Sequence, residues 1–456
     1  MKILLITPEN QFIRAFRRGQ LNNFAQLTMP HLAGFVSPQH QVTLLDERVQ
    51  TVDLDAPFDL VGITCSTPNA SHVYRMADAF RARGRLVVLG GPHPTLLPDE
   101  ARPHADVLVI GEAEATWPQL LEDLVRGGLR SEYRSSPGES PSLEHLPTPR
   151  RDLIAGRSWL ADTVIATRGC PHRCHFCNLR QIYAPELRFR PVEEVAGEIR
   201  GLRAPFFAFW DDQLFMDRDY AHRLFGAMEG LNRRWAAMAT QDSVSDDRLL
   251  TAAARAGCTC LFLGLESFSE ASLGSVNKAF NRVEGYGDVV ARIHAHGISV
   301  QAGIVFGFDG DDMSCFERTL DLATRIGLDG ATVSILTPFP QTEIFRSLQA
   351  AGRLLTQDWS YFNGKTAVAF RPARMSPEEL WNGYMWFRRR FYSQRCILER
   401  IARSGVRPLQ SLALNWGYRR ALDNPLPGWP IPSGDRRAEL DWPSPGRWSG
   451  RVPPSR

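Results

Sequence analysis

The sequence predicts an α/β protein in which two parallel sheets follow one another along the chain and a helical region comes last. Short, nearly continuous apolar runs alternate with amphipathic helical segments over residues 1–125, and the same alternation returns over residues 160–345. Such runs are typical of parallel strands that are buried on both faces. From about residue 358 the alternation ends and helical periodicity takes over.

The first repeat, residues 1–133, predicts a doubly wound, Rossmann-like sheet. We expect strands at residues 3–7, 42–45, 60–64, 86–89 and 107–110, with a helix over residues 71–83. Ligands of such folds lie at the carboxyl ends of the strands, and here these ends carry Ser66, Gly90, Gly91 and Glu112. Small residues there let a ligand approach the backbone, although a glycine pair alone also suits a tight strand–helix turn.

The second repeat, residues 157–355, predicts a barrel or partial barrel of six strand–helix units. A Pro- and Ser-rich linker, residues 134–156, separates it from the first repeat. We expect strands at residues 163–167, 206–210, 235–240, 260–265, 300–306 and 332–336, with helices such as 192–202 and 247–256. Chemistry in barrels of this kind takes place at the carboxyl ends of the strands.

The C-terminal region, residues 356–423, is expected to be helical. Ser376 followed by Pro377 and Glu379 is a helix-start pattern with a capping box, which predicts a helix over residues 377–391, and a second helix is expected over residues 396–403. Residues 424–456 are rich in Pro, Gly and Trp and predict an extended tail.

Composition excludes several classes of partner. The 456 residues carry 53 basic and 50 acidic side chains, a net charge of +3, so no nucleic-acid or membrane-surface signature is present. No stretch approaches the roughly 20 apolar residues of a membrane span, and the N-terminal apolar run is too short for a signal peptide. The cysteine usage does not suggest a disulfide scaffold, so a cytoplasmic location is expected.

The most informative motif is a C-x3-C-x2-C loop formed by Cys170, Cys174 and Cys177. Thiolates are the usual ligands of iron–sulfur clusters, and four close a four-iron cluster. Three on one loop leave one iron free to bind a small molecule. Zinc is the alternative, but structural zinc sites take four ligands, no second C-x2-C unit is present, and His172 and His175 lie too close in the loop to complete one.

The segment Thr167-Arg-Gly-Cys-Pro-His-Arg-Cys-His-Phe-Cys177 resembles the radical S-adenosylmethionine (SAM) superfamily. The resemblance implies a partial (β/α)6 barrel, a [4Fe-4S] cluster on the three cysteines, and SAM on the free iron. It also implies polar SAM contacts at the carboxyl ends of the barrel strands, namely Asp211, Asp212, Gln241 and Glu266. The alternatives are a helix N-cap for the aspartates and a hydrogen bond at the barrel rim for Gln241.

The first repeat, placed directly before this loop, resembles a cobalamin-binding domain. The resemblance implies that Ser66, Gly90, Gly91 and Glu112 bind cobalamin. One departure stands out: many cobalamin domains carry a cobalt-ligating histidine after the first strand, whereas this chain reads Pro8-Glu-Asn-Gln-Phe-Ile13 there.

The aromatic-rich stretch after residue 363 looks like the group containing hopanoid methylases and anaerobic tetrapyrrole-ring enzymes. That resemblance implies a C-methyltransferase that acts through a 5′-deoxyadenosyl radical on an unactivated carbon of a lipid, tetrapyrrole or secondary metabolite. It also implies a bulky, apolar small-molecule substrate and an external electron donor of the flavodoxin or ferredoxin type. A packed helical cap without substrate contact is the alternative for the aromatic stretch. For the whole chain, the alternatives are a non-methylating cobalamin radical SAM enzyme, such as an oxidative cyclase, and a cobalamin sensor or carrier whose cluster is structural.

Overall fold

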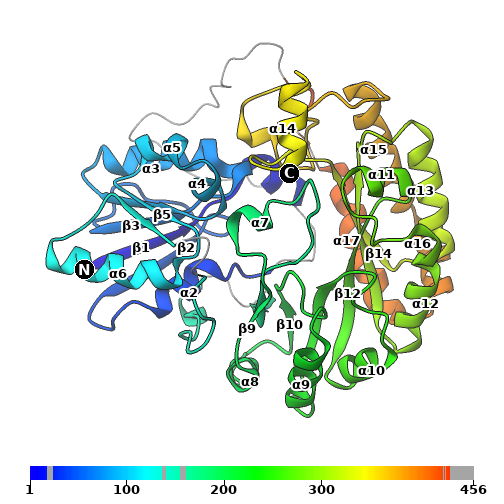
Figure 1. The fold of residues 1–456 in the computed structure, drawn as a ribbon, viewed down its shortest axis with the longest axis horizontal. Helices are drawn as coiled ribbons and strands as arrows, with labels where there is room; N and C mark the ends of the chain where they lie inside the picture. Colours follow the sequence, from blue (N-terminus) through cyan, green and yellow to red (C-terminus); the bar gives the residue numbers. More distant parts are fainter. Residues whose placement is uncertain (18–23, 136–139, 155–160, 425, 427, 432–456) are drawn as a thin grey trace.

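Two parallel sheets, each packed against helices, lie side by side in the computed structural model, with the first at the left and the second at the right of Figure 1. The structure describes the chain except for residues 18–23, 136–139, 155–160, 425, 427 and 432–456. The predicted α/β fold class is confirmed. The predicted tail, residues 424–456, lies mostly outside the described residues.

The first sheet has the order β2-β1-β3-β4-β5-β6, and all its strand pairs are parallel. Its strands are β1 (Lys2–Thr7), β2 (Gln41–Asp46), β3 (Leu60–Thr64), β4 (Leu86–Gly90), β5 (Val107–Ile110) and β6 (Glu132–Arg134). The first five follow the prediction within one residue. The prediction missed β6, because this three-residue edge strand has only one buried side chain, Tyr133.

Helices cover both faces of the first sheet. On one face α2 (Thr28–Gly34) and α6 (Ala113–Arg126) share a core with the strands, and on the other face α3 (Ala70–Arg81) does so. The shorter helices of this region are α1 (Gln11–Arg17), α4 (Pro92–Leu96) and α5 (Pro98–Ala101). Burial on both faces explains why the strand sequences are continuously apolar.

The second sheet has the order β14-β13-β12-β11-β10-β7, so it is a six-stranded barrel that stays open between its edge strands. Its strands are β7 (Asp162–Val164), β10 (Phe206–Phe209), β11 (Arg234–Ala239), β12 (Cys258–Glu266), β13 (Ser299–Phe306) and β14 (Gly330–Ile335). The predicted strand at 163–167 divides in two: β8 (Thr167–Arg168) leaves the barrel and pairs antiparallel with β9 (Arg188–Phe189).

The two faces of the barrel sheet differ in burial. On β12, Leu261, Leu263 and Leu265 are buried in the core shared with the outer helices, whereas Phe262 and Glu266 on the inner face are only half-buried. The same alternation is seen on β11 and β14. The helices of the barrel region are α7 (Leu179–Ile182), α8 (Val192–Arg200), α9 (Arg218–Met228), α10 (Asp247–Arg255), α11 (Glu270–Ser275), α12 (Tyr286–Ala295), α13 (Ser314–Arg325) and α14 (Glu343–Ala350). The hydrophobic core therefore lies on the helix side, and the inner face remains accessible.

Three helices complete the chain: α15 (Pro377–Phe391), α16 (Gln394–Ser404) and α17 (Pro408–Arg420). The predicted capping box is confirmed, since Ser376 Oγ accepts from the Glu379 N–H at 3.1 Å and Glu379 Oε2 accepts from the Ser376 N–H at 2.7 Å. The prediction missed α17, which contacts the edge strand β14. No helix in the described part of the chain is long and apolar enough to cross a membrane.

Candidate cofactor and active site

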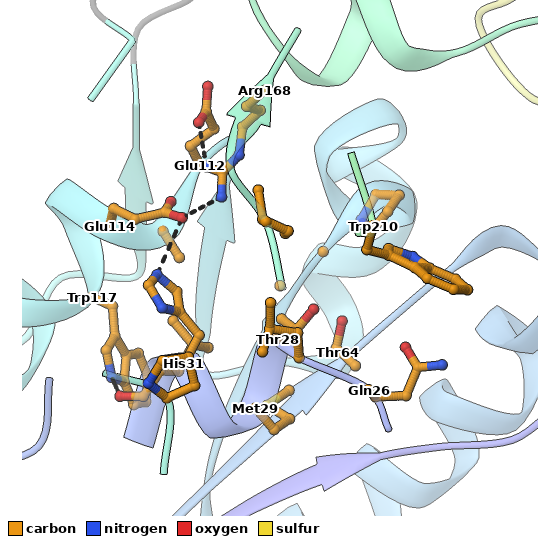
Figure 2. A pocket seen from close by; sticks show the side chains of 18 of the residues that line it. Gln26, Thr28, Met29, His31, Thr64, Glu112, Glu114, Trp117, Arg168 and Trp210 are labelled. Atoms are coloured by element: carbon orange, nitrogen blue, oxygen red, sulfur yellow. Dashed lines mark hydrogen bonds and ion pairs between the residues drawn. The ribbon is translucent and has the colours of Figure 1, made fainter. Parts of the chain in front are cut away.

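A cavity of about 390 Å³ lies between the two sheets, and residues from both line it. The first sheet contributes the carboxyl ends of its central strands, including Thr64, Gly90 and Gly91. The segments that follow β7 and β10 contribute Arg168 and Asp212. Figure 2 shows its lining side chains, with Trp117 and Trp210 well apart across the view. We call it the inter-sheet cavity. The edge predicted to bind a ligand therefore faces the barrel directly.

Glycines keep the inter-sheet cavity open on the side of the first sheet. A Cβ at Gly62, in the middle of β3, would come within 2.8 Å of Leu5 Cδ2, and one at Gly91 would come within 2.8 Å of Thr64 Oγ1. Gly91 also has φ +100°, a conformation that side-chain-bearing residues rarely adopt. Leu5, Gly62 and Trp117 all line this side of the cavity.

Three of the four residues predicted to contact cobalamin lie at the inter-sheet cavity, and the fourth does not. Gly90, Gly91 and Glu112 line the inter-sheet cavity, whereas Ser66 is not among its lining residues. The Ser66 N–H instead donates to Asn69 Oδ1 at 2.8 Å in a cap at the start of a short 3-10 helix. A cobalamin contact at Ser66 stays a prediction.

A buried ion-pair cluster joins the first sheet to the cysteine loop. Arg168 donates to Glu112 at 2.5 Å and to Glu114 at 2.7 Å, while Arg188 donates to the other oxygen of Glu112 at 2.6 Å. His31 Nε2 lies 3.4 Å from Glu114 Oε1, and Figure 2 marks this contact between the two side chains with a dashed line. Burial acts to raise the pKa of Glu114, but Arg168 and His31 together outweigh it and hold that pKa well below its ordinary value. Glu112, predicted to bind cofactor, is thus already engaged by two guanidinium groups.

The cysteine loop follows Arg168 directly. Gly169 at φ +103° turns the chain, and a Cβ there would collide with the carbonyl of Glu186. Cys170, Cys174 and Cys177 are free and half-buried. Burial raises the pKa of each thiol, that of Cys177 to about 12, so these ligands need a metal to be held as thiolates.

The chemistry of this loop fits an iron–sulfur cluster better than a single ion. Within the described residues, no three His, Cys, Asp or Glu side chains are arranged to hold one metal ion. Cluster thiolates bind different iron atoms and need not converge on one point. At the loop, Gln213 Oε1 and His172 Nε2 are buried without a hydrogen-bond partner, and Gln213 Nε2 donates to Cys170 Sγ at 3.5 Å.

The acidic pair after β10 divides its roles. Asp211 is 1% exposed and its carboxylate accepts the backbone N–H groups of Ala166 and Thr167, which ties β10 to the chain after β7. Asp212 lines the inter-sheet cavity. Burial raises the pKa of Asp212 to about 6, against the pull of Arg168. Asp212 is therefore the carboxylate of the pair that faces ligand space.

Gln241 uses its amide locally. Its Oε1 accepts from the Arg282 N–H at 2.6 Å, and its Nε2 donates to the Arg282 carbonyl at 3.0 Å. This matches the alternative of a structural hydrogen bond at the barrel rim. A SAM contact at Gln241 stays a prediction.

Glu266 ends β12 on the inner face of the barrel and pairs with Lys278, whose Nζ lies 3.3 Å from Glu266 Oε1. Lys278 also lies over the Phe280 ring at 5.1 Å. Burial acts to lower the pKa of Lys278, but the negative charges of Glu266 and Cys174 outweigh this effect and raise the pKa above its ordinary value. The lysine is therefore held charged beside the cysteine loop. The sequence prediction missed Lys278, because it lies in a loop with no motif or periodicity to mark it.

Comparisons with known proteins agree with this geometry. The Radical SAM superfamily model matches residues 164–323, and the B12 binding domain model matches residues 28–121. The bacteriochlorophyllide d C-12(1)-methyltransferase of Chlorobaculum tepidum is 31% identical over 426 residues, which is 91% of each chain. The C-8(2)-methyltransferase of the same organism is 26% identical over 73% of this chain and 78% of its own.

Among solved structures, the fold is similar to that of the cobalamin-dependent S-adenosylmethionine radical enzyme OxsB with aqua-cobalamin and S-adenosylmethionine bound. The TM-score is 0.69 at 14% identity, covering 91% of this chain and 71% of that one. This likeness confirms the architecture of two successive parallel sheets.

Proposed function

The chain belongs to the cobalamin-dependent radical SAM methyltransferase family, and we propose that it methylates a side-chain carbon of a tetrapyrrole. The observation that carries the proposal is the 31% identity to a bacteriochlorophyllide methyltransferase over 91% of both chains. The accessible inner face of the barrel, next to the inter-sheet cavity, supports a substrate site between SAM and cobalamin.

The family's cofactors are a [4Fe-4S] cluster, SAM and cobalamin. When bound, they supply the electron that cleaves SAM and the methyl group that is transferred. Cys170, Cys174 and Cys177 would hold the cluster. Gly62, Gly90 and Gly91 would let cobalamin approach the backbone of β3 and the carboxyl end of β4.

We assign the orientation of SAM to three charged residues. Asp212 faces the inter-sheet cavity and would accept hydrogen bonds from the SAM ammonium group. Lys278, buried beside Cys174, would bind the SAM carboxylate. Glu266, on the inner face of the barrel, would accept the ribose hydroxyls. Desolvation strengthens all three contacts because charge-assisted hydrogen bonds are strongest out of water.

The test is an anaerobic assay of the protein reconstituted with iron, sulfide and hydroxocobalamin. The reaction contains a reductant, methyl-labelled SAM and bacteriochlorophyllide d. We expect labelled methyl-tetrapyrrole together with 5′-deoxyadenosine and S-adenosylhomocysteine. 5′-Deoxyadenosine with an unlabelled, oxidised or cyclised product would instead establish the non-methylating alternative.

A matched pair of variants separates the catalytic reading from the sensor reading. Cys174→Ala should abolish both nucleoside products, whereas Cys396→Ala, at a buried cysteine far along the chain on α16, should retain them. Full cellular function in Cys174→Ala would favour a sensor or carrier. The proposal also includes a flavodoxin- or ferredoxin-type donor and a cytoplasmic location, which stay predictions.

A further inference from the structure

The inner face of the barrel continues from the proposed SAM site to the edge strand β14. Gly303 on β13 pairs with Thr332 on β14, and Val305 pairs with Ser334. A Cβ at Gly303 would lie 3.6 Å from Glu266 Oε2. Because paired residues of neighbouring strands point to the same side, Thr332 and Ser334 share the face that carries Glu266.

Lys365 reaches this face from the segment before α15. Its Nζ donates to Ser334 Oγ and to the Val333 carbonyl, each at 2.6 Å. The backbone of Lys365 is fixed as well, since its N–H donates to Asn363 Oδ1 at 2.9 Å and its carbonyl accepts from the Tyr384 hydroxyl at 3.2 Å. An ammonium group has three donors, so one N–H remains for a ligand.

Two arginines stand near Lys365. Arg388 on α15 is 4% exposed, and its guanidinium lies over the rings of Phe16, at 4.7 Å, and Tyr384, at 5.4 Å. Arg17 is the last residue of α1, directly after Phe16. Burial and the positive charges of Arg388 and Arg17 lower the pKa of Lys365 to about 7. We call Arg17, Lys365 and Arg388 the cationic cluster.

Among the residues that the structure describes, Lys365 and Arg388 of the cationic cluster have no carboxylate partner among the ion pairs and hydrogen bonds of the structure. Within the described residues, the charged groups that act on the pKa of Lys365 are both cations. The Arg388 side chain hydrogen-bonds Met385 Sδ, at 3.6 Å, and the Tyr384 hydroxyl, and neither group is a carboxylate. Glu9 acts to raise the pKa of Arg17, but the same carboxylate also lies 3.9 Å from Arg14 and is shared between the two arginines. Arg388 is buried and Lys365 is half-buried, whereas Arg17 is exposed. Like charges held partly out of water without a counter-charge are costly, so an anion that enters beside Lys365 and Arg388 is stabilised.

We propose that the cationic cluster binds a carboxylate of the substrate and so fixes the substrate's orientation in the barrel. The inference rests on the proposed function and deepens it, because it selects tetrapyrroles with a free acid side chain. The carboxylate is not that of SAM, for which Lys278 lies beside the cysteine loop. The cobalamin phosphate is also excluded, because none of the three cations lines the inter-sheet cavity.

The experiment is equilibrium binding to the cobalamin- and cluster-loaded enzyme without SAM or reductant, followed by the absorbance of the pigment. Bacteriochlorophyllide d, with its free propionate, is compared with its propionate methyl ester. We expect the wild-type chain to bind the acid about 10- to 100-fold more tightly, the range for hydrogen bonds to a charged group. Lys365→Met and Arg388→Gln should each reduce this preference to about threefold or less.

The matched control is Arg389→Gln, which removes the same charge from an exposed position next to Arg388 on α15 and should keep the preference. Bound cobalamin, measured in every variant, verifies that the fold is intact, and the wild-type comparison needs no variant at all. Equal binding of acid and ester by a chain that methylates both would overturn the carboxylate site while the proposed function stands. If neither compound binds nor is methylated, the tetrapyrrole proposal fails and this inference fails with it.

Discussion

Replacing Arg168 by methionine tests whether the buried ion-pair cluster holds the first sheet against the cysteine loop. Methionine keeps much of the side-chain length but removes the charge that Glu112 and Glu114 share. Glu112 retains Arg188 at 2.6 Å, whereas Glu114 retains only His31 at 3.4 Å. Breaking a buried pair by removing one partner costs about 3–5 kcal/mol of folding free energy, and we expect a loss in that range at pH 8.

The loss should depend on pH in a defined direction. In the native chain the pKa of Glu114 lies well below the ordinary 4.5, against the effect of burial and chiefly because of Arg168. Glu114 therefore stabilises the fold above pH 4.5, and that contribution is lost as the pH falls through the depressed pKa. In Arg168→Met only His31 is left to offset burial, so we expect the folded-state pKa of Glu114 to rise above 4.5. The carboxylate then increasingly destabilises the fold as the pH rises.

The assay is urea unfolding of the cofactor-free protein, followed by tryptophan fluorescence at pH 5 and pH 8. The difference between wild type and Arg168→Met should be larger at pH 8. The double variant Arg168→Met with Glu114→Gln should recover part of the loss, because it removes the unpaired carboxylate. A loss under about 1 kcal/mol, or one that neither pH nor Glu114→Gln changes, would refute the structural role assigned to Arg168.

Three further predictions test the site and the fold. Gly62→Val should lower the cobalamin retained after desalting at least tenfold, because a Cβ at this position meets Leu5 at 2.8 Å, whereas Gly226→Ala, where nothing lies within 4 Å, should leave it unchanged. Asp212→Asn should weaken SAM binding, measured by calorimetry, with little change in stability. Asp211→Asn should instead lower the free energy of unfolding by about 1–3 kcal/mol in thermal or urea unfolding, because it disturbs two buried hydrogen bonds to backbone N–H groups. Ser376→Ala should cost about 1 kcal/mol in the same unfolding measurement, since it removes the capping oxygen of α15.

The parts of the fold that the sequence predicts are those that depend on short-range patterns. Continuous apolar runs locate β3 and β5 to the residue, and the capping box locates the first residue of α15. The edge strand β6 and the helix α17 escape prediction. β6 is only three residues long, and α17 keeps several large apolar side chains exposed, including Leu409 and Trp416.

The site is predicted less completely because its decisive contacts join distant positions. The spacing of Cys170, Cys174 and Cys177 is itself the signal for a cluster. Nothing local indicates that Glu112 meets Arg168, which is 56 residues away. Asp211 accepts backbone N–H groups, whereas the next residue, Asp212, lines the inter-sheet cavity. The two aspartates are adjacent in the loop after β10, so their spacing does not tell the two roles apart.

The contact between Glu112, Glu114 and Arg168 has a consequence for recombining relatives of this chain. The carboxylates follow the last central strand of the first sheet, and the guanidinium immediately precedes the cysteine loop of the barrel. A chimera that takes its first sheet from one parent and its barrel from another keeps this ion-pair contact only if the first parent supplies the two carboxylates and the second supplies the guanidinium. Crossover points chosen in the linker at residues 134–156 should therefore be accepted or rejected by the residues at these three positions, and not by the linker's own sequence.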